Sequence, residues 1–162
     1  MIMKKSLLLA ALSLGLGACT VSVRPGVSVN VSQANLVTNF QPDRGEGSTY
    51  FVGERIRFNL STARDGYVTV VSLDPDGRGD VLLNNAFVRA GTSTIGADNR
   101  FQITPPRGVQ RVRVIFTTER PSSTLVFRGQ YSRGEWNTYT ESYVRPYGVE
   151  QRDVYETFFY IR

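Results

Sequence analysis

Three aspartates fall close together between two apolar runs, in the segment SLDPDGRGDVLL: Asp74, Asp76 and Asp80. Calcium loops place carboxylates at alternate positions around a glycine, and Gly77 stands at such a bend. A calcium site is therefore one hypothesis for these residues. Two positions argue against it, because Arg78 stands where the loop needs an oxygen ligand and Asn85 where it needs a bidentate glutamate.

The same segment also has the composition of a tight turn between two strands. Pro75 fixes φ at the second turn position, and Asp76-Gly77 supplies residues that tolerate left-handed geometry. The triplet Arg78-Gly79-Asp80 matches a cell-adhesion signal, although a three-residue match arises easily by chance. The turn preferences favour a hairpin turn over a metal site or an adhesion signal.

Residues for catalysis are scarce in this chain. It contains no histidine, which removes the commonest general base and most zinc sites. Pairs of carboxylates can also do chemistry, as in glycosidases. Four candidate acids show no spacing that argues for such a pair: Glu54, Asp98, Glu135 and Glu141. We therefore expect a protein that is not an enzyme and needs no cofactor.

The chain begins with two lysines, a short apolar run and a cysteine. The run over residues 7–18 is too short to span a bilayer comfortably but fits a secretory signal peptide. Its end, Leu16-Gly17-Ala18-Cys19, resembles the bacterial lipobox, in which the cysteine is acylated and becomes the mature N-terminus. Cys19 is the only cysteine, so we expect a lipoprotein signal peptide over residues 1–18 and an anchor at Cys19.

The residue after the cysteine bears on which membrane holds the anchor. Enterobacterial lipoproteins retained in the inner membrane carry aspartate there, whereas this chain has Thr20. We therefore expect a cell-envelope protein anchored in the outer membrane. Two of its 19 basic residues are the lysines of the signal peptide, which leaves only a modest excess over 14 acids. The arginines are scattered along the chain, which argues against a nucleic-acid partner.

Most of the remaining chain alternates apolar and polar residues. In VQRVRVIFT (109–117), Val112, Val114 and Phe116 alternate with Arg111 and Arg113. Such alternation predicts strands with one buried and one polar face. Similar segments recur with turn signals about every 8–12 residues, about eight to ten strands in all, and no window shows a helical apolar period. We predict an all-β, antiparallel β-sandwich, Ig-like or jelly-roll-like.

The predicted organisation has three parts. After the signal peptide, residues 19–32 form a tether and first strand, since their valines share one parity. Residues 33–162 form a single β-sandwich domain, with a core over 50–120 and an aromatic-rich C-terminal part over 121–162. We find no internal repeat and no linker to a second domain.

Several short motifs of the core occur in a characteristic order. They are Tyr50, Gly53-Glu54, Ile56 and Phe58, then Asp65-Gly66-Tyr67-Val68, Asp76-Gly77, Asn84-Asn85, Ala90-Gly91 and Pro106-Arg107-Gly108. In this order and spacing, residues 50 to about 120 resemble DUF4384, a bacterial domain family of unknown function. Leu83-Asn84 departs from the family's usual proline-asparagine pair. The resemblance implies a β-rich accessory or recognition module of envelope lipoproteins, without catalytic residues to transfer. The chain also resembles small envelope lipoproteins of Deinococcus-type bacteria.

The C-terminal part carries aromatic residues interleaved with arginines. Its last segment, VYETFFYI, has the pattern of core packing, whereas residues 131–153 alternate poorly and resemble an exposed recognition loop. Four residues are candidates for contact with a partner: Trp136, Tyr139, Tyr143 and Tyr147. Packing, a protein-binding surface, and contact with a glycan or membrane interface stay open as interpretations.

These features predict a membrane-anchored envelope lipoprotein with a structural or recognition role. Its partner would be an envelope protein, or a cell-wall or surface-layer component, held near the membrane by the tether. The alternative is a ligand-binding module that holds calcium through Asp74, Asp76 and Asp80, or a glycan through its aromatic residues.

Overall fold

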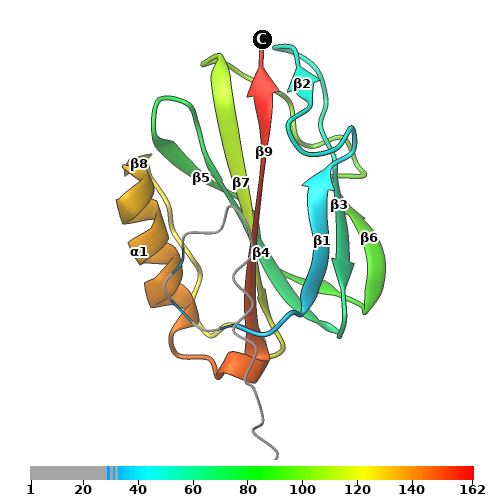
Figure 1. Cartoon of the computed structure of the whole chain (residues 1–162), viewed down its shortest axis with the longest axis vertical. Coiled ribbons are helices and arrows are strands. Elements are labelled where there is room, and N and C mark those ends of the chain that lie inside the picture. Colours follow the sequence, from blue (N-terminus) through cyan, green and yellow to red (C-terminus); the bar gives the residue numbers. More distant parts are fainter. Residues whose placement is uncertain (1–28, 30, 32) are drawn as a thin grey trace, which may run out of the picture.

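A computed structural model describes residues 29, 31 and 33–162 (Figure 1). The predicted signal peptide, the lipidation site Cys19 and most of the predicted tether and first strand lie outside the described residues. Within them, no helix is both long and apolar enough to cross a membrane.

The described residues form nine strands, one α-helix and one short 3-10 helix. In chain order they are β1 (Val37–Pro42), β2 (Thr49–Tyr50), β3 (Phe58–Thr62), β4 (Gly66–Leu73), β5 (Arg78–Val88), β6 (Gly91–Ile95), β7 (Gly108–Thr117), β8 (Gly129–Gln130), α1 (Arg133–Val144), η1 (Val149–Gln151) and β9 (Arg152–Ile161). A three-stranded sheet has the order β1-β3-β6, and a six-stranded sheet the order β2-β9-β7-β4-β5-β8. Pairing is antiparallel except between β2 and β9. The predicted all-β, sandwich-like fold is confirmed.

The first core lies between the two sheets. Its aromatic centre includes the stacked rings of Phe40 and Phe58, whose centroids lie 5.4 Å apart. Phe58 belongs to an alternating set that the sequence places inward and that is buried here, Ile56, Phe58 and Leu60. From the six-stranded sheet, Val68 of β4 and Val114 of β7 complete this layer. Burial of such side chains contributes about 1.5–3 kcal/mol each and is the main stabilising term.

The second face of the six-stranded sheet is also covered. Figure 1 shows α1 on the side of the central sheet opposite to β1, β3 and β6. Trp136 and Val144 of α1 pack on Ile115 of β7 and Val154 of β9 in a second core. The expectation that this face is polar, with Arg113 outward, is wrong: Arg113 is fully buried here. A central strand covered on both faces buries both sets of alternating side chains.

The helix α1 occupies a segment that the sequence suggests is an exposed loop. It begins with a capping box, in which the Glu135 backbone N–H donates to the Ser132 side chain and the Glu135 carboxylate accepts from the Ser132 backbone. Its buried residues recur every four positions: Trp136, Thr140 and Val144. The Arg152 guanidinium donates to three carbonyls at its C-terminal end, including that of Val144 at 3.1 Å.

The C-terminal part completes the sheet that the core begins. Strand β9 lies between β2 and β7 and pairs with β7 over ten residues. Asp153 at the start of β9 accepts the backbone N–H groups of Leu36 and Val37, both at 2.7 Å, and so ties the entry of β1 to β9. Residues 50–120 therefore depend on residues outside that range for both sheets.

Two further segments with strand-like composition form almost no strand. In the segment RFQIT (100–104), only an isolated bridge forms, between Gln102 and Arg55. In the segment STLVFRG (123–129), only Gly129 joins a strand, in the short β8. The rest of that segment is described below, because it borders the candidate site.

Candidate recognition surface at the edge of β5

The aspartate-rich segment is a tight turn between β4 and β5. The Gly77 N–H donates to the Asp74 carbonyl at 2.9 Å, and the Asp74 N–H donates to the Arg78 carbonyl at 2.8 Å. Gly77 has φ of +87°, which a glycine adopts without strain. The strands then pair from Leu73 opposite Gly79. The prediction of a hairpin turn is confirmed.

The carboxylates of this turn engage neighbouring donors. Arg78 forms an ion pair with Asp74 at 2.7 Å and lies 3.5 Å from Asp80. Gln110 donates to the other oxygen of Asp74 at 2.8 Å, and Asp76 accepts the Arg78 backbone N–H at 3.1 Å. Among the described residues, no group of three acids, histidines or cysteines could hold a metal ion. Arg78 takes the central place that calcium would need.

The candidate catalytic acids engage neighbouring groups rather than one another. Glu54 pairs with Arg44 at 3.0 Å, and the hydrogen bond from Arg44 holds the pKa of Glu54 below its usual value. Arg100 lowers the pKa of Asp98 in the same way. Glu135 caps α1, and hydrogen bonds from Ser132 lower its pKa. Glu141 lies near the end of the same helix.

The four candidate aromatic residues divide into one buried and three accessible side chains. Trp136 is fully buried, so its assignment as a partner contact is wrong: an indole beneath the helix cannot reach a partner of the folded protein. Tyr139 is 48% exposed and packs edge-on against Phe127 and Tyr131. Tyr143 is half-buried and donates to the Asn85 side chain at 3.0 Å. Tyr147 is half-buried, and desolvation raises its pKa.

Trp136 instead belongs to a buried ionic network. The Arg113 guanidinium carbon lies 3.7 Å above the centroid of the Trp136 ring. Arg113 also binds Glu156 at 2.6 Å and donates to Thr140 and Asn137, each at 2.7 Å. Desolvation lowers the pKa of Arg113, and the charge of Glu156 opposes that shift. The network fixes α1 on the sheet.

One edge of the six-stranded sheet is incompletely paired. Strand β5 pairs with β4 along its length, but on its other side it pairs with β8 only at Arg78 and Gly79. No other described strand pairs with residues 80–88 on that side. A row of backbone donors and acceptors without a strand partner is a template for another chain.

Residues 123–128 run beside this edge without forming a ladder with it. The two are joined by side-chain amides: Asn84 donates to the Leu125 carbonyl at 3.1 Å, and Asn85 to the Ser123 carbonyl at 3.3 Å. A hollow of about 360 Å³ lies between residues 80–84 and residues 124–128. The Val126 side chain stands at its border and is 63% exposed.

A second hollow lies between β5 and β6 of the three-stranded sheet. It has a volume of about 290 Å³ and is lined by Leu83 of β5, Ile95 of β6 and Phe101. Leu83 borders both hollows, so the two flank one short stretch of β5. We call this stretch, residues 80–88 with its two hollows, the β5 edge.

The β5 edge is irregular where it opens. The register with β4 shifts twice, between Val68 and Val71 of β4, and Asn85 has φ of +48°. Such bulges bend a strand and limit pairing with unrelated strands. Thr69 accepts the Asn85 N–H at 3.1 Å, which holds the bulge in place. The two adjacent leucines and two adjacent asparagines, which break the alternation, are the only sequence signal of this edge.

Residues 80–84, which precede the bulge at Asn85 and border the first hollow, are suited to recognition by strand addition. In that mode an extended segment bonds to an open edge through its backbone, and pockets beside the edge take alternate side chains. The aromatic group of Phe127, Tyr131 and Tyr139 lies next to the first hollow, since Phe127 lines it. Two of the four aromatic candidates also adjoin this region: Tyr139 through Phe127, and Tyr143 through Asn85.

Comparison with known proteins identifies one family. Residues 49–120 match the family model described as "Domain of unknown function (DUF4384)". No curated protein and no solved structure matches the chain. The match runs from β2 to just beyond β7. It includes β5 and the strand residues that line the two hollows, whereas residues 123–128 lie beyond it. The resemblance of this part of the chain to the DUF4384 family is therefore confirmed.

Proposed function

We propose that this protein is a lipid-anchored recognition module of the cell envelope. In this proposal Cys19 carries the anchor, the outer membrane holds it, and the β5 edge binds an extended segment of an envelope protein by strand addition. The observation that carries the proposal is the edge itself: residues 80–88 have one strand partner among the described residues, β4, and Leu83 borders two hollows lined by apolar and polar residues.

The parts of the molecule have distinct roles in this mechanism. The backbone of β5 supplies hydrogen bonds that any extended segment can satisfy, and the hollows at Leu83 select its side chains. Val126 and Phe87, which are 63% and 56% exposed, supply apolar contact area. The anchor restricts the module to the membrane surface, which raises its effective concentration near a partner there. A weak binding face is then sufficient.

Site-specific photocrosslinking in intact cells tests this proposal. A photoreactive amino acid is placed at Val126 or Phe87, on the β5 edge, and as a matched control at Phe51, which is 59% exposed next to β2 at the opposite edge of the sheet. We expect the same envelope polypeptide to be crosslinked from Val126 and Phe87 and not from Phe51. The surface substitution Val126→Lys should abolish the adduct from Phe87, whereas Phe51→Lys should leave it intact.

The anchor is tested in the same cells with Cys19→Ser. We expect this change to remove the protein from the membrane fraction and to reduce the adduct from Val126. Equal crosslinking from Phe51, or an adduct from Phe87 that survives Val126→Lys, would contradict recognition at the β5 edge.

A further inference from the structure

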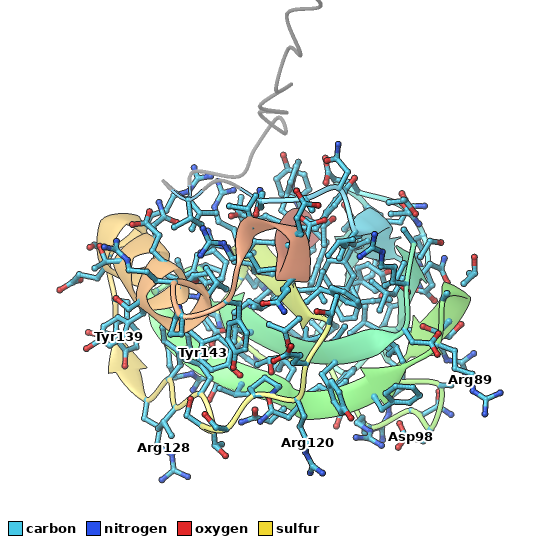
Figure 2. The ribbon with its side chains drawn as sticks, turned by 90° about the horizontal axis from the view of Figure 1, so that it is seen from below. Arg89, Asp98, Arg120, Arg128, Tyr139 and Tyr143 are labelled. Carbon is cyan, nitrogen blue, oxygen red and sulfur yellow. The ribbon has the colours of Figure 1, made fainter. Side chains whose placement is uncertain are left out.

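Arginine side chains border the β5 edge. Arg89 follows β5 directly, Arg128 lines the first hollow, and Arg120 follows β7. Figure 2, a view from below, shows all three projecting outward along the same rim of the molecule, the rim on which β5 lies. All three are exposed, and in the part of the chain that the structure describes none of their guanidinium groups has a hydrogen bond or an ion pair.

The acids near this rim already have partners. Asp98 binds Arg100 through hydrogen bonds of 2.7 and 2.9 Å. Asp80 lies 3.5 Å from Arg78, and Glu119 accepts a hydrogen bond from Gln151 at 2.9 Å. None of these acids pairs with Arg89, Arg120 or Arg128, so an approaching chain meets three guanidinium groups that are free to bind it.

We infer that the segment bound at the β5 edge is acidic: an extended polypeptide with apolar residues for the two hollows and aspartate or glutamate where it passes the rim. This inference rests on the proposed function and adds the charge of the partner. Opposite charge across a rim speeds association and excludes partners of the wrong sign more than it adds affinity. Guanidinium groups suit carboxylates because they bind them with two parallel hydrogen bonds.

Two other occupants fit these observations less well. A second copy of this chain would bring the same rim against itself in a symmetric dimer, which places like charges together. An anionic membrane would satisfy the arginines, but it has no backbone to pair with residues 80–88 and no side chains to fill the hollows beside Leu83. The edge and the rim together fit an acidic strand.

The experiment measures binding of three synthetic peptides to the full-length protein in detergent. The first is a dodecamer of alternating valine and threonine with two glutamates at each end. The second has lysine at the four glutamate positions, and the third keeps the glutamates but has two prolines at its centre. The protein is used unchanged and as the variant Arg89→Gln/Arg120→Gln/Arg128→Gln, with Arg162→Gln, exposed at the C-terminus, as a matched control.

We expect the glutamate peptide to bind at least about tenfold more tightly than the lysine peptide at low salt. The triple variant should lose most of that difference, Arg162→Gln should keep it, and the proline peptide should not bind. If the glutamate and lysine peptides bind equally, the acidic inference is overturned while strand addition stands. Either of two results overturns strand addition itself: the proline peptide binds as well as the glutamate peptide, or the glutamate and lysine peptides both fail to bind.

Two further measurements exclude the other occupants. The first is binding to phosphatidylglycerol vesicles. If the triple arginine variant weakens vesicle binding as much as it weakens binding of the glutamate peptide, the inference is overturned in favour of a lipid surface. Sedimentation measures whether the protein forms a dimer. A dimer that Val126→Lys disrupts and that the glutamate peptide does not dissociate would overturn the inference in favour of a second copy. We expect neither result.

Discussion

The two faces of the six-stranded sheet are packed by different means. The face toward the three-stranded sheet is apolar, with aromatic rings such as Phe40 and Phe58 at its centre. The face toward α1 holds a buried arginine, Arg113, between the Trp136 ring and the Glu156 carboxylate. Both faces exclude water, but only the second depends on charges being paired.

This difference predicts different responses to substitution. An apolar layer loses transfer free energy in proportion to the atoms removed, and its neighbours partly fill the space. In a buried ion pair, replacing one partner is costly because the other charge is left buried without a partner. The cost therefore depends on which partner is replaced and on what other charges remain nearby. Besides Arg113, Glu156 binds Arg111 at 3.4 Å and Arg133 at 3.3 Å. The Glu156 carboxylate therefore keeps two cationic partners when Arg113 is replaced, whereas Arg113 loses its carboxylate partner when Glu156 is replaced.

The largest effect should follow from Glu156→Leu. It leaves Arg113 buried without a carboxylate and three arginines close together, and we expect the free energy of unfolding to fall by about 3–5 kcal/mol. Arg113→Met should cost less, because Glu156 keeps Arg111 and Arg133 as partners. Chemical denaturation measures both. If Arg113→Met costs more than Glu156→Leu, the asymmetry is absent.

The double variant Arg113→Met/Glu156→Leu sharpens the comparison. Because it removes both charges and fills the space with apolar side chains, it should be more stable than Glu156→Leu alone and recover most of the loss. A double variant whose cost is the sum of the two single costs would show that the charges of Arg113 on β7 and Glu156 on β9 do not stabilise each other.

On the apolar face, Phe58→Leu should cost about 1.5 kcal/mol, since a smaller side chain of similar character leaves only part of the ring volume empty. Denaturation at low and high salt distinguishes the faces. The cost of Phe58→Leu should not change with salt, and a clear salt dependence would mean that charges contribute to this face as well.

The cap of α1 predicts a smaller effect. Ser132→Ala removes the side chain that accepts the Glu135 N–H and should lower the free energy of unfolding by about 1 kcal/mol. Ser142→Ala, on the exposed surface of the same helix, is the matched control. Equal effects of the two changes would mean that the capping box does not contribute.

The smallest effect concerns pH. The pKa values of Glu54 and Asp98 are lowered by their arginine partners, so their contribution to stability is present above the ordinary carboxylate pKa and is lost as pH falls through the lowered value. The thermal midpoint should therefore fall slightly more between about pH 5 and pH 3 for the parent chain than for Glu54→Gln. Glu46→Gln, in the exposed loop between β1 and β2, is the matched control.

Much of the sheet could be predicted from local pattern. Ile56, Phe58 and Leu60 alternate with polar residues, and the structure buries all three. The Asp74–Gly77 turn follows from residues that favour turns by their own backbone geometry. These features depend on neighbours along the chain, which a sequence displays directly.

Features that depend on distant partners were not predictable in this way. Arg113 is buried because α1 brings Trp136 to it and β9 brings Glu156, residues 23 and 43 positions away. The helix itself had a local signal, the Ser132–Glu135 capping box, but polar Thr140 lies at its centre and hides the apolar period. The β5 edge exists because no other described strand pairs with residues 80–88 on the side away from β4. A local sequence pattern does not show which strands pair with one another.

Hydrogen exchange tests the recognition surface most directly. Backbone amide exchange is measured on the full-length protein with and without the glutamate peptide. We predict that protection rises at residues 80–88 of β5 and stays unchanged at β2 and β1, which lie at other edges of the two sheets and line neither hollow. Protection that rises at β2 or β1 instead, or that does not rise at residues 80–88 while the peptide is bound, would contradict recognition at the β5 edge.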